Sequence, residues 1–366
     1  MGKKYSVIIF SLLVIMNLFT AIAQGETKIV INVPAFTLYL YEYGVQVKSF
    51  PIGVGSELKP SVLGPTRIIN NVVDPTYYPP KMAEYGLEPI PPGPDNPVGS
   101  RWLGLDMPGY GIHGTNVPQS IGKAASAGCI RMRNEDVEKL SSLVKVGTPV
   151  EIIYQTVLLL EDPLLHTKTI TVYPDLYNRD TSHEQLLIEL EHKGWNGVFW
   201  PIINELIDTP TARPSPMAWA LSLKLDGTEI DLNAVEVDDT YYLPFDFILD
   251  PKLEYFTDLK KWGEQYFLPL SIYEQLTGFR YSKAQGFLTL HSPHVYAGEE
   301  YLGKALIHCG EIYINSDNIS RNLIPEKIEV LSFWGNFYLP ASKLRVSYPH
   351  DQLRLEWTDT NMLSWE

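Results

Sequence analysis

Two side chains in this sequence have the chemistry of a nucleophile and its base: Cys129 and His113, with fifteen residues between them. A thiol attacks carbonyl groups as its thiolate, and a free cysteine has a pKa of about 8.5. A neighbouring imidazole can accept the thiol proton and stabilise the resulting ion pair. The base then needs an acceptor for its second ring nitrogen, and a backbone carbonyl is sufficient. The pair therefore predicts nucleophilic catalysis by Cys129, with His113 as the base.

The residues around Cys129 fit the same chemistry. Gly128 permits a tight turn and a close approach of substrate, and backbone N–H groups at Gly128 and Cys129 could stabilise an oxyanion. On an extended segment Arg131 faces the same side as Cys129, where its charge could bind a carboxylate. A plain surface charge is the alternative interpretation of Arg131. A histidine and a cysteine alone would mean little, because a lone buried cysteine is usually a small hydrophobic residue.

Three segments together form a specific pattern. The chain carries GIHGTN at 111–116, SIG at 120–122 and SAGCIRM at 126–132. A turn at 60–65 precedes them, and GTPV at 147–150 follows. With this pattern, the segment from Ile29 to Tyr154 resembles the catalytic domain of the L,D-transpeptidases, often called the YkuD domain. Many members of that family have histidine directly before the Gly-Cys pair, where this chain has Ala127. The departure leaves His113 as the base.

The resemblance implies a reaction in two steps on peptidoglycan stem peptides. Cys129 would attack the peptide carbonyl of a stem-peptide diamino acid and release a terminal D-alanine. An amine from a neighbouring stem would then attack the thioester and form a cross-link. His113 would carry the protons, oriented by the carbonyl of Gly114 or a neighbour, and Ser126 would support the loop. No cofactor or metal is expected. The proline-rich stretch from Pro75 to Pro97 would form a lid that keeps water from the thioester.

The sequence leaves other functions open. Hydrolysis of the same thioester would make the protein an L,D-carboxypeptidase, because acceptor binding and water exclusion decide between the two outcomes. A non-catalytic wall-binding protein could carry an inactive remnant of the domain, but a remnant could lack any of the residues named above. A papain-like protease is disfavoured, because its glutamine and asparagine partners have no recognisable counterpart here.

The amino-terminal residues predict export. Lys3 and Lys4 precede an almost wholly apolar run from Val7 to Phe19, and Ala21–Ala23 supplies a small-x-small cleavage site. Residues 1–23 are therefore expected to be a cleaved signal peptide. An uncleaved anchor is the alternative, but the run is short for a bilayer span. Cleavage would make the net charge of −14 more negative by two, which argues against binding to nucleic acid. We expect a secreted protein that reaches the cell wall through specific contacts.

The two cysteines, Cys129 and Cys309, do not form a disulfide framework. Either they make one bridge, or Cys129 is a reactive thiol and Cys309 is incidental; so few cysteines in an exported chain favour the second interpretation. The spacing of His291, His294 and His308 is not that of a metal site.

The 366 residues are enough for two or three domains. We expect a mainly β fold with some α: a β-rich catalytic domain over 27–155, a linking helical region over 156–217 and an accessory α+β domain over 218–357. Apolar spacing predicts a helix from Asn134 to Gly147, and Ser182 and Gln185 have the spacing of a capping box.

The accessory region shows a weak internal repeat. An aromatic-aromatic-Leu-Pro motif begins at Tyr241, Tyr266 and Phe337, and the last two copies each precede an alternating strand. These motifs loosely resemble the non-catalytic amino-terminal domain of copper amine oxidases, an accessory unit of exported bacterial proteins, without implying copper. The oligomeric state stays open.

Overall fold

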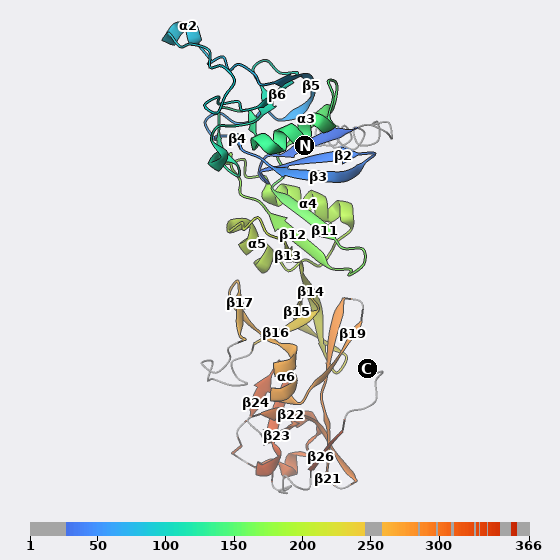
Figure 1. The fold of residues 1–366 in the computed structure, drawn as a ribbon. Helices are drawn as coiled ribbons and strands as arrows, with labels where there is room; N and C mark the ends of the chain where they lie inside the picture. Colours follow the sequence, from blue (N-terminus) through green and yellow to red (C-terminus); the bar gives the residue numbers. More distant parts are fainter. Residues whose placement is uncertain are drawn as a thin grey trace, which may run out of the picture. The chain divides into compact units, whose positions relative to one another are not determined.

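A computed structural model describes residues 27–245 and 258–356, except residues 285, 298, 309–310, 326, 329, 335 and 345–352. The expected signal peptide and Cys309 lie outside the described residues. The described chain is β-rich with few helices, as predicted. It forms two compact units (Figure 1). The first unit comprises the described residues up to 158, with 171–188 and 210–213. The second comprises residues 159–170 and 189–209 and the described residues from 214 onward. None of the described helices has the length and apolar character that a bilayer span requires.

The first unit is built on an eight-stranded sheet with the order β3-β2-β1-β10-β5-β6-β7-β9. Its strands are β1 (Lys28–Asn32), β2 (Thr37–Glu42), β3 (Val45–Pro51), β5 (Gly64–Val73), β6 (Arg101–Leu105), β7 (Gly111–His113), β9 (Ile130–Arg131) and β10 (Pro149–Ile153). Two short strands, β4 (Val54–Gly55) and β8 (Ala124–Ser126), form a separate parallel pair. The alternation of apolar residues determines the faces of the sheet. Ile29 and Ile31 of β1 lie opposite Leu40 and Leu38 of β2, and all four are fully buried.

One helix of this unit, α3 (Asn134–Leu143), packs on β6 and β7. Val137 and Leu140 are fully buried, on the helical face that the sequence predicts. The boundaries differ from the prediction: Arg133 is the N-cap residue, and the helix ends at Leu143, before Gly147. Asn134 does not cap the helix, because its side-chain oxygen accepts hydrogen bonds from two loop N–H groups instead.

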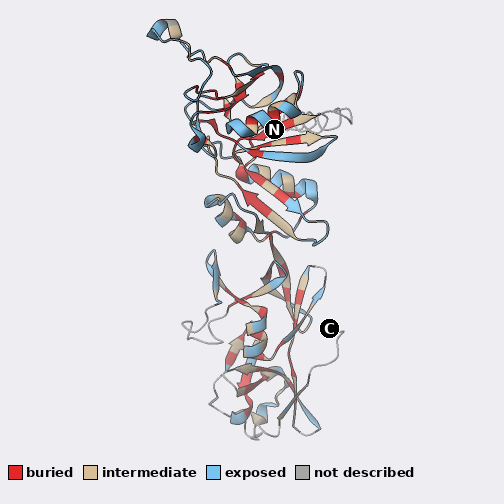
Figure 2. Ribbon diagram, viewed as in Figure 1, coloured by how far each residue is buried: buried red, intermediate tan, exposed pale blue. Residues whose placement is uncertain are grey.

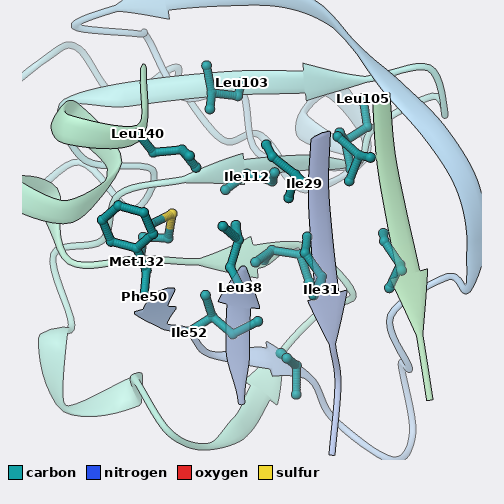
Figure 3. Packing of buried hydrophobic residues seen from close by; sticks show 14 of the residues in the cluster. Ile29, Ile31, Leu38, Phe50, Ile52, Leu103, Leu105, Ile112, Met132 and Leu140 are labelled. Atoms are coloured by element: carbon teal, nitrogen blue, oxygen red, sulfur yellow. The ribbon is translucent and has the colours of Figure 1, made fainter. Parts of the chain in front are cut away.

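The apolar side chains of the first unit meet in one cluster between the sheet and α3. Figure 3 shows Ile112 of β7 and Met132, just after β9, within this cluster, and Figure 2 shows buried residues along the strands. Ile130 of β9 belongs to the same cluster. Because successive residues of a strand point to opposite faces, the neighbours of Ile112 and Ile130 point away from it. That opposite face carries the candidate site.

The segment expected as a helical linker contains strands as well as helices. Strands β11 (Val157–Glu161), β12 (Lys168–Val172) and β13 (Ser215–Pro216) form a sheet, and the helices are α4 (Ser182–Lys193) and α5 (Trp200–Asp208). The predicted capping box is wrong. The N–H of Gln185 donates to the carbonyl of Thr181, so Ser182 is already helical. The Gln185 side chain instead accepts hydrogen bonds from the N–H and hydroxyl of Thr156.

The second unit contains two sheets with corresponding strand orders, β17-β18-β16-β15-β14-β20-β19 and β24-β25-β23-β22-β21-β26. The first comprises β14 (Ala218–Leu225), β15 (Thr228–Val237), β16 (Thr240–Pro244), β17 (Lys260–Trp262), β18 (Gln265–Pro269), β19 (Arg280–Ala284) and β20 (Phe287–His291). The second comprises β21 (His294–Ala297), β22 (Glu300–His308), β23 (Glu311–Asn315), β24 (Leu331–Phe333), β25 (Asn336–Pro340) and β26 (Leu353–Glu356). Helix α6 (Leu270–Thr277) follows β18, and a 3-10 helix (Ala341–Lys343) follows β25. The two sheets differ in strand number, seven against six, and in one pairing: β20 is parallel to β14, whereas β26 is antiparallel to β21.

The aromatic-aromatic-Leu-Pro motifs follow this correspondence only in part. The copies that begin at Tyr266 and Phe337 end the corresponding strands β18 and β25, whereas the copy at Tyr241 ends β16, which pairs with β18. The leucine of each copy is buried: Leu243, Leu268 and Leu339. The motif therefore marks where a strand end enters the core. The resemblance to the copper amine oxidase amino-terminal domain stays a prediction.

Candidate active site

Strands β7 and β9 bring three of the predicted site residues together. The strands are parallel, with Ile112 paired to Ile130 and His113 paired to Arg131. Ile112 and Ile130 point into the core, so His113 and Arg131 share the opposite face. Cys129 directly precedes β9, and the charge of Arg131 acts on both its thiol and the His113 imidazole. Residues far apart in the sequence thus form one cluster.

The imidazole of His113 is held by two contacts. Its ring stacks on the indole of Trp102, the residue directly opposite on β6, with centroids 5.5 Å apart and planes at 20°. Its Nδ1 lies 2.6 Å from the carbonyl oxygen of Gly114. A carbonyl can only accept, so Nδ1 carries the proton and Nε2 keeps its lone pair. The orienting bond expected from the Gly114 carbonyl is present, and it leaves Nε2 as the basic atom.

Burial determines the charge state of His113, which is only 5% exposed. Desolvation is the largest cause lowering the pKa of His113, the hydrogen bond to Gly114 raises it and the positive charge of Arg131 lowers it; together these give a pKa of about 4. The imidazole is therefore neutral at neutral pH and can accept a proton.

The thiol of Cys129 is partly buried, and its Sγ lies 3.4 Å from the carbonyl oxygen of Gly109. Burial raises the pKa of Cys129, while a backbone hydrogen bond from Gly111 and the charge of Arg131 act in the opposite direction. Taken with the low pKa of His113, these shifts favour a neutral thiol and a neutral imidazole at rest. A thiolate–imidazolium pair is therefore not favoured before substrate binds. The thiol proton would move to His113 as the sulfur attacks.

The turn before Cys129 is closed by Ser126. Its hydroxyl donates to the carbonyl of Cys129 at 2.6 Å and accepts from the N–H of Gly128 at 3.0 Å. Gly128 has a φ of 115°, and a Cβ there would lie 2.7 Å from the ring of Tyr110. A side chain at this position would be strained and would collide with Tyr110, so the turn requires glycine.

Two amides near the site, one of them the Gly128 N–H expected to stabilise an oxyanion, already have acceptors. The N–H of Gly128 donates to Ser126, and the N–H of Gly114 donates to the carbonyl of Arg101 at 3.1 Å. A Cβ on Gly114 would lie 2.1 Å from the side-chain oxygen of Asn134, so this glycine makes room for α3. No residue in the described part of the chain accepts a hydrogen bond from the Cys129 N–H. The turn therefore leaves this amide available as a hydrogen-bond donor.

A cavity of about 200 Å³ lies in the first unit, beside several residues that contact the site. It is lined by Ile69, Asn70, Trp102, Gly104, Leu105, Asp106, Met107, Pro108, Gly109 and Tyr110. Three of these residues also belong to the site: Trp102 stacks on His113, Gly109 contacts the sulfur and Tyr110 covers Gly128. These three contacts connect the cavity to the site, although Cys129 and His113 do not line it.

The proline-rich stretch from Pro75 to Pro97 contributes no residue to this cavity, and its role as a lid stays a prediction. It contains a short helix, α2 (Met82–Tyr85), which projects from the rest of the first unit (Figure 1). Backbone hydrogen bonds between Tyr77 and Ile90 close the stretch on itself, and the fully buried Asn96 binds the carbonyls of Pro75, Ile90 and Pro91. The stretch also contacts the loop after His113, because the side-chain amide of Asn116 donates to the carbonyl of Asp95 at 2.9 Å.

Several residues of the site could not be found from the sequence. Trp102, Tyr110 and Asn134 contact the predicted residues only because strands and loops far apart in the sequence meet here. No spacing rule relates them to Cys129. Their aromatic or amide character is too common in this chain to serve as a signal.

Comparison with known proteins identifies the domain. Residues 26–152 match the family model of the L,D-transpeptidase catalytic domain, YkuD. A Bacillus licheniformis protein named as L,D-transpeptidase YkuD is 42% identical over 125 residues, which cover 34% of this chain and 64% of the relative. Escherichia coli YbiS, also named as an L,D-transpeptidase, is 40% identical over 145 residues, covering 37% of this chain and 47% of the relative. A crystal structure of an Enterococcus faecium L,D-transpeptidase aligns with 21% identity and a TM-score of 0.29, covering 35% of this chain and 50% of that chain.

The predicted resemblance to the L,D-transpeptidase catalytic domain is thus supported over residues 26–152. The chain spans less than two thirds of the length of the curated relatives given above.

Proposed function

We propose that the protein is an exported L,D-transpeptidase, which links peptidoglycan stem peptides through a thioester on Cys129. One observation carries the proposal: His113, with a free Nε2 lone pair, pairs with Arg131, whose charge also acts on the Cys129 thiol, inside a segment that matches this family. The amino-terminal signal-like residues support export, and the acceptor and wall location follow from the family chemistry.

In the first step, His113 Nε2 takes the proton of Cys129 as the sulfur attacks the carbonyl carbon before the terminal D-alanine. The Cys129 N–H stabilises the oxyanion, and the Arg131 charge stabilises negative charge on the sulfur and the oxygen. The intermediate then collapses with cleavage of the C–N bond. An imidazolium in a site where the pKa of His113 is about 4 is a strong acid, so it readily protonates the departing amine.

In the second step, an amine of another stem peptide attacks the thioester. Nε2 removes a proton from this amine, the C–S bond breaks, and the thiolate recovers its proton from the imidazolium. The cavity beside Gly109 supports binding of one amino-acid-sized group next to the sulfur, because Trp102, Met107 and Tyr110 provide apolar walls.

Hydrolysis is the second candidate outcome, and one observation favours it. Cys129 is partly exposed, and the Pro75–Pro97 stretch lines no part of the cavity. Water can therefore compete with an amine for the thioester, which would give L,D-carboxypeptidase activity.

The test is incubation of the full-length protein with disaccharide-tetrapeptide, with products followed by mass spectrometry. A cross-linked dimer supports transfer, and tripeptide without dimer supports hydrolysis. Cys129→Ala should make neither product, whereas Cys309→Ala, which removes the other cysteine, should retain activity. Equal product from the wild type and Cys129→Ala would contradict the proposal.

A further inference from the structure

A segment beyond the matched catalytic domain binds the loop that supports the nucleophile turn. The hydroxyl of Tyr177 donates to the carbonyl of Gly55 at 2.9 Å and accepts from the N–H of Ser61 at 3.0 Å. Next to it, the amide of Asn178 donates to Glu57 at 2.5 Å. The Gly55–Ser61 loop is thus closed from outside by two consecutive side chains.

This loop connects directly to the turn that carries Cys129. The hydroxyl of Ser61 accepts from the N–H of Gly55 and donates to the carbonyl of Gly128, both at 2.9 Å, and Ser61 is only 3% exposed. The peptide unit between Gly128 and Cys129 is planar and trans, so its C=O and N–H point in opposite directions. Holding the Gly128 oxygen therefore aims the Cys129 N–H, the amide left for the oxyanion.

Tyr177 is itself fixed in place. Its N–H donates to the hydroxyl of Tyr154 at 2.8 Å, and the two rings stack with centroids 5.2 Å apart. The Tyr154 hydroxyl donates to Asp175 at 2.5 Å. Burial, followed by this bond to Asp175, raises the pKa of Tyr154 well above its ordinary value, so the phenol keeps its proton.

The loop has little freedom to adjust. A Cβ on Gly55 would lie 2.4 Å from the carbonyl oxygen of Lys59 and 2.5 Å from the N–H nitrogen of Ser61. In such a tight loop, loss of the Tyr177 hydroxyl leaves the Ser61 N–H without its acceptor. The effect should therefore pass to Gly128 through the Ser61 side chain.

We propose that Tyr177 is a positioning residue of the active site, which orients the Cys129 N–H through Ser61 and Gly128. This inference rests on the proposed thioester chemistry. Tyr177 lies outside residues 26–152, so the segment after the family domain would contribute to catalytic geometry. It touches neither substrate nor the reacting atoms.

The test compares full-length Tyr177→Phe with the wild type. Loss of oriented oxyanion stabilisation should lower kcat for D-alanine release by about tenfold, with KM nearly unchanged. Alkylation of Cys129 by iodoacetamide, which forms no oxyanion, should keep its wild-type rate, and the loss of the Ser61 N–H acceptor should lower the melting temperature by only a few degrees. Tyr173→Phe is the matched control, because the Tyr173 hydroxyl bonds to Tyr39.

A second variant tests the route. Ser61→Ala should lower kcat in the same way, and the double variant should be no slower than Ser61→Ala, because residues acting in series are not additive. Additive losses of kcat in the double variant would overturn the inference. An unchanged kcat in Tyr177→Phe would also overturn it, as would comparable losses of kcat, alkylation rate and melting temperature in that variant. A wild type that forms no product refutes the proposed function, whereas an active wild type with an equally active Tyr177→Phe refutes this inference alone.

Discussion

The low pKa of His113 predicts an active site that works at unusually acid pH. The catalytic base must be neutral to accept the thiol proton, and burial lowers the pKa of His113 to about 4. Since kcat/KM follows the ionisation of the free enzyme, its acid limb should fall near this pKa. The charge of Arg131 contributes to the shift, so removing that charge is the perturbation that tests the explanation.

The expected magnitude is large. At pH 5 an imidazole with the ordinary pKa of about 6.5 is only about 3% neutral. With a pKa of about 4, His113 is about 90% neutral at that pH. The two cases differ about 30-fold in the fraction of competent enzyme, and hence in kcat/KM. Arg131→Gln should move the acid limb to higher pH, because a nearby positive charge disfavours the imidazolium.

The assay measures kcat/KM for D-alanine release across the acid range, with circular dichroism at each pH to verify that the protein stays folded. Arg131→Lys is the matched control: it keeps the positive charge and should move the limb less than Arg131→Gln. A wild-type limb near the ordinary imidazole pKa would refute the burial argument. A limb that Arg131→Gln leaves in place, or moves to lower pH, would refute the role given to the arginine charge.

Three further predictions concern the framework of the site. Gly128→Ala should inactivate the protein. Gly122→Ala is the control: its φ is 79° but nothing lies within 4 Å of its Cβ, so it should cost only the local backbone strain of about 1–2 kcal/mol. Activity and denaturant unfolding would separate the two variants, and similar effects would contradict the contact of Gly128 with Tyr110. The pKa of His113 in the folded state lies below its unfolded value, so the stability that this residue contributes is present above pH 6.5 and lost as the pH falls towards 4. The loss should be about 3 kcal/mol in the free energy of unfolding of the first unit, and His113→Gln should abolish this pH dependence. Asn134→Ala should destabilise that unit by about 1–3 kcal/mol, because two loop N–H groups lose their acceptor, and an unchanged denaturation midpoint would argue against this.

Much of the first unit could be predicted from local patterns. The alternation in β1 and β2 predicted which residues are buried, because a strand points successive side chains to opposite faces. The spacing of Val137 and Leu140 predicted a helix and its buried face. The predictions of the helix boundaries and of the Ser182 cap were less accurate. Asn134 and Gln185 bind distant backbone groups, and such competition is invisible in a local pattern.

The sequence by itself determined the reacting pair. A thiol in a Gly-Cys turn with a histidine before it is typical of nucleophilic catalysis. The carbonyl of Gly114, which orients the imidazole, directly follows His113 in the chain. Tertiary structure decided what the pair can do. The register of β7 against β9 pairs His113 with Arg131, whose charge also acts on Cys129, and burial against Trp102 and the core keeps the imidazole neutral. Hydrogen bonds from Ser126 and Ser61 decide which amide remains for an oxyanion. These outcomes depend on desolvation and on contacts between distant segments, which exist only in the folded chain.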